Sequence, residues 1–368
     1  MSSGCSVGLG GIRAHSIYPV DPPVIMSPVH LRRLYAATSA FLFLTLLTAA
    51  LVGCDPLAPP PTVVVIVLTT PPPPTAIPSD TPPPTNTPSA TPRPTATLTP
   101  TFTPRPTITP FTCTEQDGRL VEMHLTSEIA KRDVPYLVYL PPCYADTGRR
   151  YPFVVLLHGA DQSERLWVDY LGIIRALDVG ISVRALPPMI VIMPGGGDVA
   201  GNGRFNPQNS YSGLIVNELL PDIEKNFCTW NEREGRAIGG ISRGGLWAFI
   251  IALQNPALFL AVGGHSPYLD LDFPANRLYN PLFMAEQVVF PPGEQPRIWL
   301  DIGTRDSVLP LAEAFRDTLQ GRGIAFAYTA NPDGEHSEAY WRAHLTEYLA
   351  FYGATWTFAP DDLPSCLE

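Results

Sequence analysis

The feature that most constrains this 368-residue chain is the hexapeptide Gly240-Ile-Ser-Arg-Gly-Gly245, here called the serine turn. The run 234–239 before it predicts a short strand, and residues 246–253 after it predict a helix. A Gly-x-Ser-x-Gly sequence between a strand and a helix forms a sharp turn, because its glycines allow neighbouring backbone to approach closely. Such a turn exposes the hydroxyl of Ser242 and directs the helix N-terminus at a reacting carbonyl. Without this context, the same pattern is often only a glycine-rich turn.

A serine hydroxyl is a good nucleophile only beside a base that a third group orients. In folds that carry this turn, the acid and then the base follow the serine along the chain. His336 lies in the loop directly after the last predicted strand, so it is the predicted base. Of the other downstream histidines, we expect His265 to line the pocket and His344 to lie on a polar helix face.

Two aspartates between Ser242 and His336 are candidates for the acid. Asp301 falls within a predicted strand, where the alternative role is a carboxylate that caps its own loop. Asp306 lies in the turn after that strand and can reach the base, so it is the predicted acid.

An acyl-transfer site also needs hydrogen-bond donors aimed at the developing oxyanion. The backbone N–H of Arg243, directly after the serine, is one expected donor. The N–H of Ala160, in the loop after an apolar strand, is the other. We expect the nearby His158 to be a structural residue of that loop.

From about Cys113 onward, predicted strands alternate with predicted helices, which indicates an α/β domain with a mostly parallel sheet and helices on both faces. Continuous apolar runs such as Phe153–Leu157 are typical of strands buried on both sides. Ligands of such sheets bind beyond the carboxyl ends of the strands. The predicted strands cover 119–127, 135–140, 153–158, 189–193, 260–264, 297–302 and 324–329, and the predicted helices cover 214–226, 246–254, 309–319 and 338–351.

The segment from about 116 to 353 resembles the esterase family of α/β-hydrolases that includes esterase D, bacterial feruloyl esterases and the antigen 85 mycolyltransferases. The resemblance implies an α/β-hydrolase fold, with Ser242 as nucleophile, Asp306 as acid and His336 as base. In this chain Arg243 replaces the usual methionine and Glu335 replaces a frequent glycine, and both departures are expected to alter the pocket. The matching motifs are Tyr139–Pro142, Tyr151–Gly159, Glu218–Glu224, the serine turn, Gly303–Asp306, Gly334–His336 and Tyr340–Arg342.

Charge and composition exclude other functions. The net charge is −10, and residues 113–368 alone contain 31 acidic and 19 basic residues. An acidic domain without basic clusters argues against a nucleic-acid partner. The glycine-rich segment 194–211 has no lysine and no phosphate-loop motif, so we expect it to be a flexible loop bordering the substrate. Neither a cofactor nor a metal is predicted.

The N-terminal part has the pattern of an export signal. Two arginines at 32 and 33 precede an apolar run over 34–52, and Gly53-Cys54 follows. Leu51–Cys54 resembles the lipobox of bacterial lipoproteins, which implies lipidation of Cys54 and a true start at Met26. The alternative is an uncleaved signal anchor, because the apolar run is nearly long enough to span a bilayer. Both alternatives place the remaining chain outside the cytoplasm, at the cell membrane.

A linker is predicted between this leader, residues 1–54, and the folded domain. Residues 55–112 contain 19 prolines and 16 threonines in 58 positions, interrupted by the apolar run Val63–Leu68. Such a composition cannot bury enough apolar surface to fold, and proline favours extended polyproline II. The domain predicted to follow covers 113–368.

Four cysteines fall in this exported domain, where disulfides persist. Cys113 and Cys366 bracket the domain, whereas Cys143 and Cys228 each precede a predicted core strand, at the end of the sheet away from the site. We therefore expect Cys113–Cys366 and Cys143–Cys228 disulfides, although three pairings are possible.

Together these features predict an exported, membrane-tethered serine esterase acting on a small-molecule or polysaccharide-linked ester through an acyl-enzyme. One alternative keeps the site but transfers the acyl group to a sugar or cell-wall acceptor. The other is a non-catalytic binding lipoprotein on a hydrolase scaffold.

Overall fold

The computed structural model describes residues 64–65, 113–269 and 274–367. The predictions for the leader 1–54, including lipidation of Cys54, and for all but two residues of the linker 55–112 lie outside the described residues. Among the helices that are described, none is both long enough and apolar enough to cross a membrane.

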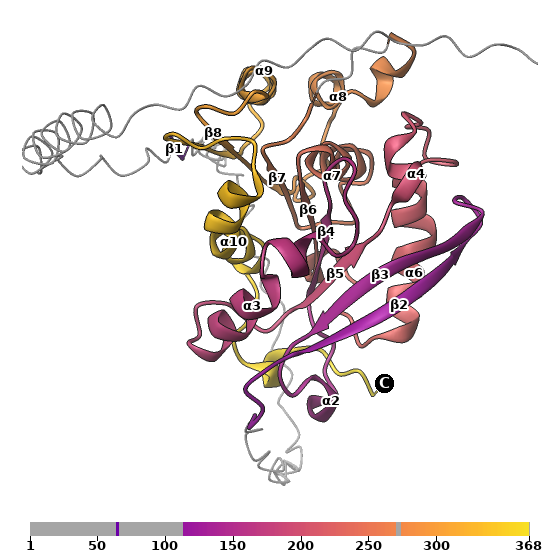
Figure 1. Cartoon of the computed structure of the whole chain (residues 1–368), viewed down its shortest axis with the longest axis vertical. Coiled ribbons are helices and arrows are strands. Elements are labelled where there is room, and N and C mark those ends of the chain that lie inside the picture. The colour runs from indigo at the N-terminus through magenta and orange to yellow at the C-terminus, as the bar shows by residue number, and fades with distance from the viewer. Residues whose placement is uncertain (1–63, 66–112, 270–273, 368) are drawn as a thin grey trace, which may run out of the picture. The chain divides into compact units, whose positions relative to one another are not determined.

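The described residues form one nine-stranded sheet in the order β1-β9-β8-β7-β6-β4-β5-β3-β2, drawn in Figure 1. Strands β5, β4, β6, β7, β8 and β9 are parallel, while β3, β2 and β1 are antiparallel to their neighbours. The predicted α/β sheet is therefore present. Its strands are β1 (Val64–Val65), β2 (Arg119–Ser127), β3 (Arg132–Leu140), β4 (Phe153–Leu157), β5 (Ile190–Pro194), β6 (Arg236–Ile241), β7 (Ala261–His265), β8 (Arg297–Gly303) and β9 (Ala327–Asn331).

Helices cover both faces of the sheet, as predicted (Figure 1). The α-helices are α2 (Tyr144–Thr147), α3 (Ile173–Ser182), α4 (Gly197–Gly201), α5 (Tyr211–Gly213), α6 (Leu220–Asn226), α7 (Arg243–Gln254), α8 (Pro281–Gln287), α9 (Leu309–Gly321) and α10 (Glu338–Gly353). Shorter or irregular helical segments are η1 (Leu166–Tyr170), η2 (Leu214–Leu219), η3 (Arg233–Gly235), η4 (Pro274–Tyr279) and η5 (Pro360–Asp362).

The two faces have separate apolar cores. Strand β4 shows why, since Val155 and Leu157 belong to the core that α6, α7, α8 and α9 cover. Its alternate residues Val154 and Leu156 belong to the core beneath η1, α3 and α10. Because side chains alternate across a strand, an uninterrupted apolar run is what two covered faces require.

Each predicted strand and helix of the domain is present, with bounds shifted by at most a few residues. Helices α2, α3, α4, α5 and α8 were not predicted. In place of the single helix predicted over 214–226, the structure has the π-helical segment η2 followed by α6. Pro221 at the start of α6 has no N–H to donate. This explains why regular α-helical hydrogen bonding starts again at that point.

The disulfides are Cys113–Cys143 and Cys228–Cys366, each with 5.7 Å between its Cα atoms, so the predicted pairing was wrong. The carboxylate of Glu115 accepts the N–H of Cys143 at 2.5 Å, which brings the start of the domain beside the N-terminus of α2.

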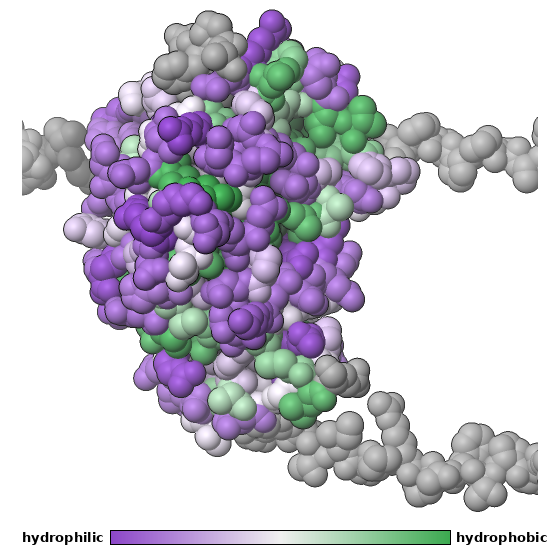
Figure 2. Space-filling model, turned by 90° about the vertical axis from the view of Figure 1, so that its right-hand side faces the viewer, coloured by the Kyte–Doolittle hydropathy of each residue, from purple (hydrophilic) through white to green (hydrophobic). Residues whose placement is uncertain are grey.

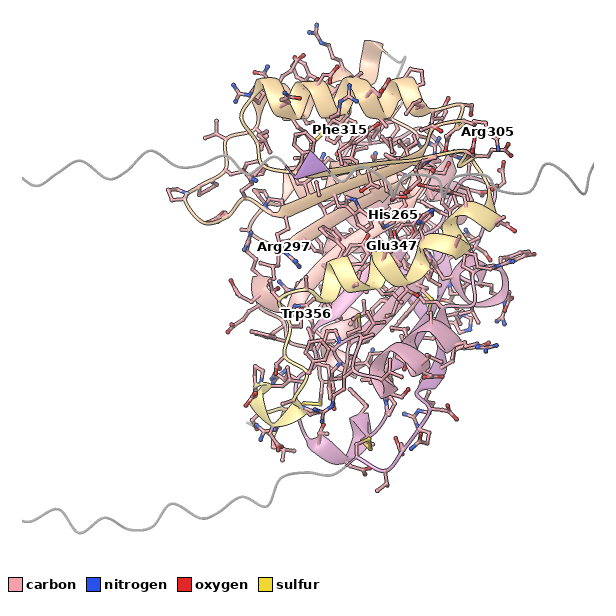
Figure 3. The ribbon with its side chains drawn as sticks, turned by 90° about the vertical axis from the view of Figure 1, so that its left-hand side faces the viewer. His265, Arg297, Arg305, Phe315, Glu347 and Trp356 are labelled. Atoms are coloured by element: carbon pink, nitrogen blue, oxygen red, sulfur yellow. A yellow bond between two sulfur atoms is a disulfide. The ribbon has the colours of Figure 1, made fainter. Side chains whose placement is uncertain are left out.

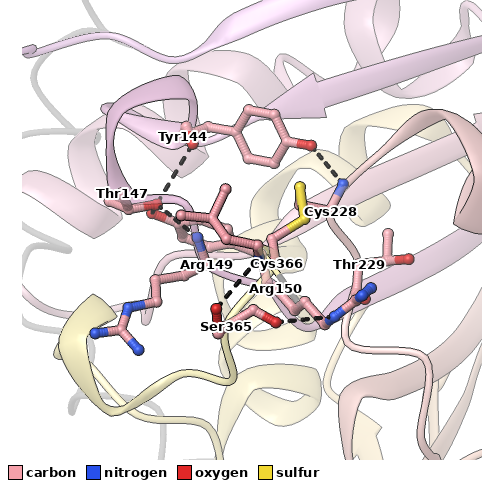
Figure 4. Close-up of a disulfide and its surroundings, with 10 residues drawn as sticks. Tyr144, Thr147, Arg149, Arg150, Cys228, Thr229, Ser365 and Cys366 are labelled. Carbon is pink, nitrogen blue, oxygen red and sulfur yellow. Dashed lines mark hydrogen bonds between the residues drawn. A yellow bond between two sulfur atoms is a disulfide. The ribbon is translucent and has the colours of Figure 1, made fainter.

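The C-terminal tail runs instead along the segment before β4. The N–H of Cys366 donates to Gly148 at 2.8 Å, and Arg150 Nε donates to Ser365 at 3.0 Å (Figure 4). This path places Cys366 at Cys228, whose N–H donates to the Tyr144 hydroxyl at 2.7 Å. Sequence order did not reveal which segments Cys113 and Cys366 meet at this end of the sheet.

Candidate active site

The serine turn has the strained geometry that its sequence predicts. Ser242 lies between β6 and α7 with φ 51° and ψ −118°, a conformation that L-residues rarely adopt. A Cβ on Gly244 would lie 2.3 Å from the carbonyl oxygen of Leu157. Glycine is therefore required at 244, where α7 begins against the end of β4. The N–H of Ser242 donates to the His265 carbonyl oxygen at 2.9 Å and fixes the turn to β7.

The three side chains singled out in the sequence meet at the carboxyl ends of β6, β8 and β9. The distance from His336 Nε2 to Ser242 Oγ is 2.9 Å. His336 Nδ1 lies 3.0 Å from both carboxylate oxygens of Asp306. The side chain of Asp306 is fully buried, whereas that of His336 is 27% exposed. The nucleophile, base and acid candidates therefore form one continuous hydrogen-bonded series.

Two adjacent loops hold the acid and the base. The turn after β8 carries Asp306, whose carboxylate accepts the N–H of Val308 at 2.9 Å. The loop after β9 carries His336, and Arg305 N–H donates to Gly334 in that loop at 2.9 Å. The ring of Trp341 packs edge-on against the imidazole, with centroids 5.1 Å apart. The imidazole is thus oriented from two sides.

The surroundings of Asp306 favour its ionised form. Burial alone would raise the pKa of this carboxyl, but hydrogen bonds from His336 and from the Val308 N–H hold the pKa below its usual range. An ionised Asp306 accepts the Nδ1 proton of His336, which leaves Nε2 free to accept a proton from Ser242.

A cavity of about 660 Å³ opens beside Ser242. The Arg243 guanidinium donates from Nε to the Ala200 carbonyl oxygen at 2.8 Å, and Trp247 Nε1 donates to the same oxygen at 3.0 Å. Segment 194–211 therefore borders the cavity, but residues 197–201 form the helix α4, held there by side chains of α7, rather than the loop that was predicted. The cavity is lined by His158, Gly159, Ala160, Asp161, Gln162, Gly197, Asp198, Ala200, Gly201, Asn202, Arg243 and Trp247.

The two predicted oxyanion donors, Ala160 and Arg243, both line this cavity. Gly159 lies against the serine, since a Cβ on it would be 3.5 Å from the Ser242 Cβ. Its N–H is already used, because it donates to Gln162 Oε1 at 3.0 Å. Gln162 was not singled out in the sequence.

His158 has the structural place expected of it. Its ring is buried, and Nδ1 donates to the neighbouring Gly159 carbonyl oxygen at 2.7 Å. Burial lowers the pKa of this imidazole, so it is neutral at neutral pH.

Two other expectations fail. His265 does not line the cavity but is fully buried against α10, where its Nδ1 lies 2.5 Å from Asp301 Oδ1. Asp301 accordingly pairs with this histidine and does not cap its own loop.

His344 lies on a polar helix face as predicted, with Nδ1 3.1 Å from Glu347. Glu335, expected to alter the pocket, is 3.5 Å from Arg305 and is not among the cavity's lining residues.

The face of the molecule that carries α4, α6 and β2 is mostly hydrophilic. Figure 2 views the molecule from the side of α4, α6 and β2, and hydrophobic side chains there form only small patches. Within the described residues, no group of three or more His, Cys, Asp and Glu side chains is placed to hold a metal ion.

Comparison with known proteins places this geometry among esterases. The model of the family described as "Putative esterase" matches residues 127–352. An esterase of Mycobacterium tuberculosis is 38% identical over 137 residues, which cover 35% of this chain and 28% of the relative. An endo-1,4-beta-xylanase/feruloyl esterase of Xylanibacter ruminicola is 30% identical over 153 residues, which cover 39% of this chain and 20% of the relative. The matched stretch thus spans less than a third of either relative.

The fold has close counterparts among solved structures. A ferulic acid esterase superposes with a TM-score of 0.58 at 21% identity, covering 65% of this chain and 99% of that chain. At this identity the likeness concerns the fold alone.

Proposed function

We propose that this chain, which belongs to the esterase family of α/β-hydrolases, hydrolyses carboxylic esters with Ser242 as the nucleophile. The observation that carries the proposal is the hydrogen-bonded series from Ser242 through His336 to Asp306. These residues come from three separate strand ends, and their order along the chain is the one that the fold requires.

In the first half-reaction, Ser242 Oγ attacks the ester carbonyl carbon while His336 Nε2 accepts the hydroxyl proton. The carbonyl oxygen becomes an oxyanion, which in this proposal accepts hydrogen bonds from the backbone N–H groups of Arg243 and Ala160. Collapse of the intermediate breaks the carbon–oxygen bond to the alcohol, which leaves with the proton from His336. The product is an acyl-enzyme on Ser242.

In the second half-reaction, water attacks the acyl carbon and gives a proton to His336. The new intermediate collapses to the free acid, and Ser242 Oγ recovers its proton from His336. Asp306 stays ionised throughout, because its charge stabilises the imidazolium that forms in both steps.

The acyl group or the alcohol enters the cavity of about 660 Å³ beside Ser242. Its wall combines the aromatic Trp247 with backbone and polar side chains, a composition that suits an aromatic acid or a sugar. Since one relative is named a feruloyl esterase, feruloyl esters of polysaccharides are the first substrate class to test.

We further propose that this domain works outside the cytoplasm on a tether. The export pattern over 26–54 supports this, as do two disulfides, which persist in oxidising compartments. The linker joins the domain at Cys113, which is bonded to Cys143 before β4, at the end of the sheet opposite the site.

The experiment compares Ser242→Ala with Ser182→Ala, a matched serine on the exposed end of α3. Hydrolysis of p-nitrophenyl acetate and of a methyl ferulate should be lost in the first variant and unchanged in the second. Both variants should keep the unfolding midpoint near the wild-type value. Full turnover by Ser242→Ala would refute the proposal. Release of the acyl group only when a sugar acceptor is present would indicate a transferase.

A further inference from the structure

A buried hydrogen-bonded cluster lies between the sheet and α10, where Figure 3 labels His265. At its centre is the fully buried carboxylate of Asp301 on β8. Oδ1 pairs with His265 Nδ1 at 2.5 Å. Oδ2 accepts two hydroxyl groups from α10, that of Tyr340 at 2.9 Å and that of Tyr348 at 3.0 Å. The proposed chemistry uses none of these groups.

The cluster satisfies the hydrogen-bonding needs of a charge that is costly to bury. Burial, followed by the nearby Asp301 charge, raises the pKa of both tyrosine hydroxyls, so they remain protonated donors. His265 Nε2 completes the cluster by pairing with the Tyr352 hydroxyl at 2.8 Å.

Tyr340 differs from Tyr348 because its hydroxyl also reaches the loop that carries His336. Asn331 is the last residue of β9 and the first anchor of that loop, and its Nδ2 donates to the Tyr340 hydroxyl at 2.8 Å. The ring of Tyr340 also packs on Gly334, since a Cβ there would lie 2.6 Å from a ring carbon. Tyr340 therefore contacts the loop at two points on the strand side of His336.

The hydroxyl of Tyr348 makes no such connection. Within the part of the chain that the structure describes, its one hydrogen-bond partner is Asp301. Its ring stacks on His265, with centroids 3.6 Å apart. The two tyrosines thus donate to the same carboxylate oxygen from the same helix, and both are at most 7% exposed.

We propose that Tyr340 is a positioning residue for the base, because its hydroxyl joins the buried Asp301 to Asn331 and so fixes the loop that holds His336 beside Ser242. The inference rests on the proposed role of His336. A displacement of about 1 Å in reacting groups can cost about a hundredfold in rate, so a small shift of this loop is enough to lower turnover.

The test compares Tyr340→Phe with Tyr348→Phe. Each removes one buried hydroxyl from Asp301, so each should lower the unfolding midpoint, and Tyr340→Phe should lower it by the larger amount. Only Tyr340→Phe also leaves Asn331 Nδ2 without its partner. We expect Tyr340→Phe to lower kcat by about tenfold to a hundredfold with little change in KM, and Tyr348→Phe to change kcat by less than about twofold.

A fluorophosphonate probe gives a second readout. It reacts with an activated serine and needs no selective substrate binding, so its reaction reports the activation of Ser242. Its labelling rate should fall in Tyr340→Phe and not in Tyr348→Phe. Asn331→Ala removes the same link from the other side, keeps the partners of Asp301, and should reproduce the loss if Tyr340→Phe does not fold.

Equal losses of kcat in the two tyrosine variants, or no loss in either, would overturn the role of Tyr340 while leaving the esterase proposal intact. A wild-type protein that neither hydrolyses esters nor reacts with the probe would instead refute the esterase proposal.

Discussion

Replacing Gly244 by alanine is expected to disable the site through backbone contact alone. The added Cβ would lie 2.3 Å from the Leu157 oxygen and 2.6 Å from the His158 oxygen, whereas ordinary contacts begin at 3.4 Å. Both neighbours are backbone atoms at the end of β4, so no side-chain rotation relieves the overlap. The start of α7 must therefore move away from β4 by about 1 Å, as judged from this overlap.

Two consequences follow. Such overpacking costs about 1–3 kcal/mol of unfolding free energy. The same movement separates Ser242, on the turn before α7, from Ala160, on the loop after β4. A misplacement of about 1 Å between nucleophile and oxyanion donor lowers kcat by about a hundredfold.

The assay measures urea unfolding and hydrolysis of p-nitrophenyl acetate for Gly244→Ala and for Gly321→Ala. Gly321 ends α9, and a Cβ there would meet no atom within 4 Å. The control should keep its activity and gain up to about 1 kcal/mol, because alanine favours the helix. Wild-type stability and turnover in Gly244→Ala would refute this account of the serine turn.

Three further predictions concern stability. Removing disulfide Cys228–Cys366 by paired serine substitutions should cost about 1 kcal/mol more than removing Cys113–Cys143 in chemical unfolding, because the sequence separations are 138 and 30 residues; an equal cost would contradict the chain-entropy argument. Because the pKa of Asp306 is lower in the folded state, this group stabilises the fold at pH values above its unfolded-state pKa of about 4. The contribution is lost as the pH falls through the folded-state pKa. The stability gap between wild type and Asp306→Asn should therefore shrink between pH 7 and pH 3 in urea titrations, and a constant gap would argue against an ionised carboxylate. Ser242→Gly should be about 1–3 kcal/mol more stable than Ser242→Ala, because glycine adopts φ 51° without strain; equal midpoints would show that the turn is unstrained.

Much of the fold could be predicted from patterns that act locally. Apolar runs such as Phe153–Leu157 mark strands buried on both sides, and the serine turn marks a strand followed by a helix. The candidate site could be predicted as well. Chain order and strand-end position single out Asp306 and His336, and the structure brings both to Ser242.

Other features depend on which segments meet in space. His265 is the last residue of β7, next to the serine turn, yet its side chain points to the face covered by α10, because successive residues of a strand alternate between faces. The partner of Asp301 could not be found for the same reason, since it comes from a neighbouring strand. Cys113 and Cys366 bracket the domain in sequence, but at the end of the sheet opposite the site each lies against a different loop.

The short edge strand β1 was also beyond the sequence patterns. Val64 and Val65 pair antiparallel with Tyr328 and Ala327 of β9, although they belong to the apolar run within the predicted linker. A run of β-branched residues favours a strand but does not specify its partner.

The most direct test of the account is to identify the atom that is acylated. The protein is mixed with excess p-nitrophenyl acetate, quenched in acid during turnover, digested and mapped by mass spectrometry. An acetyl group on Ser242, absent from Ser242→Ala and from His336→Ala, is the predicted result. Turnover in the absence of any adduct on Ser242, or an adduct on another residue that survives in Ser242→Ala, would contradict the proposed mechanism.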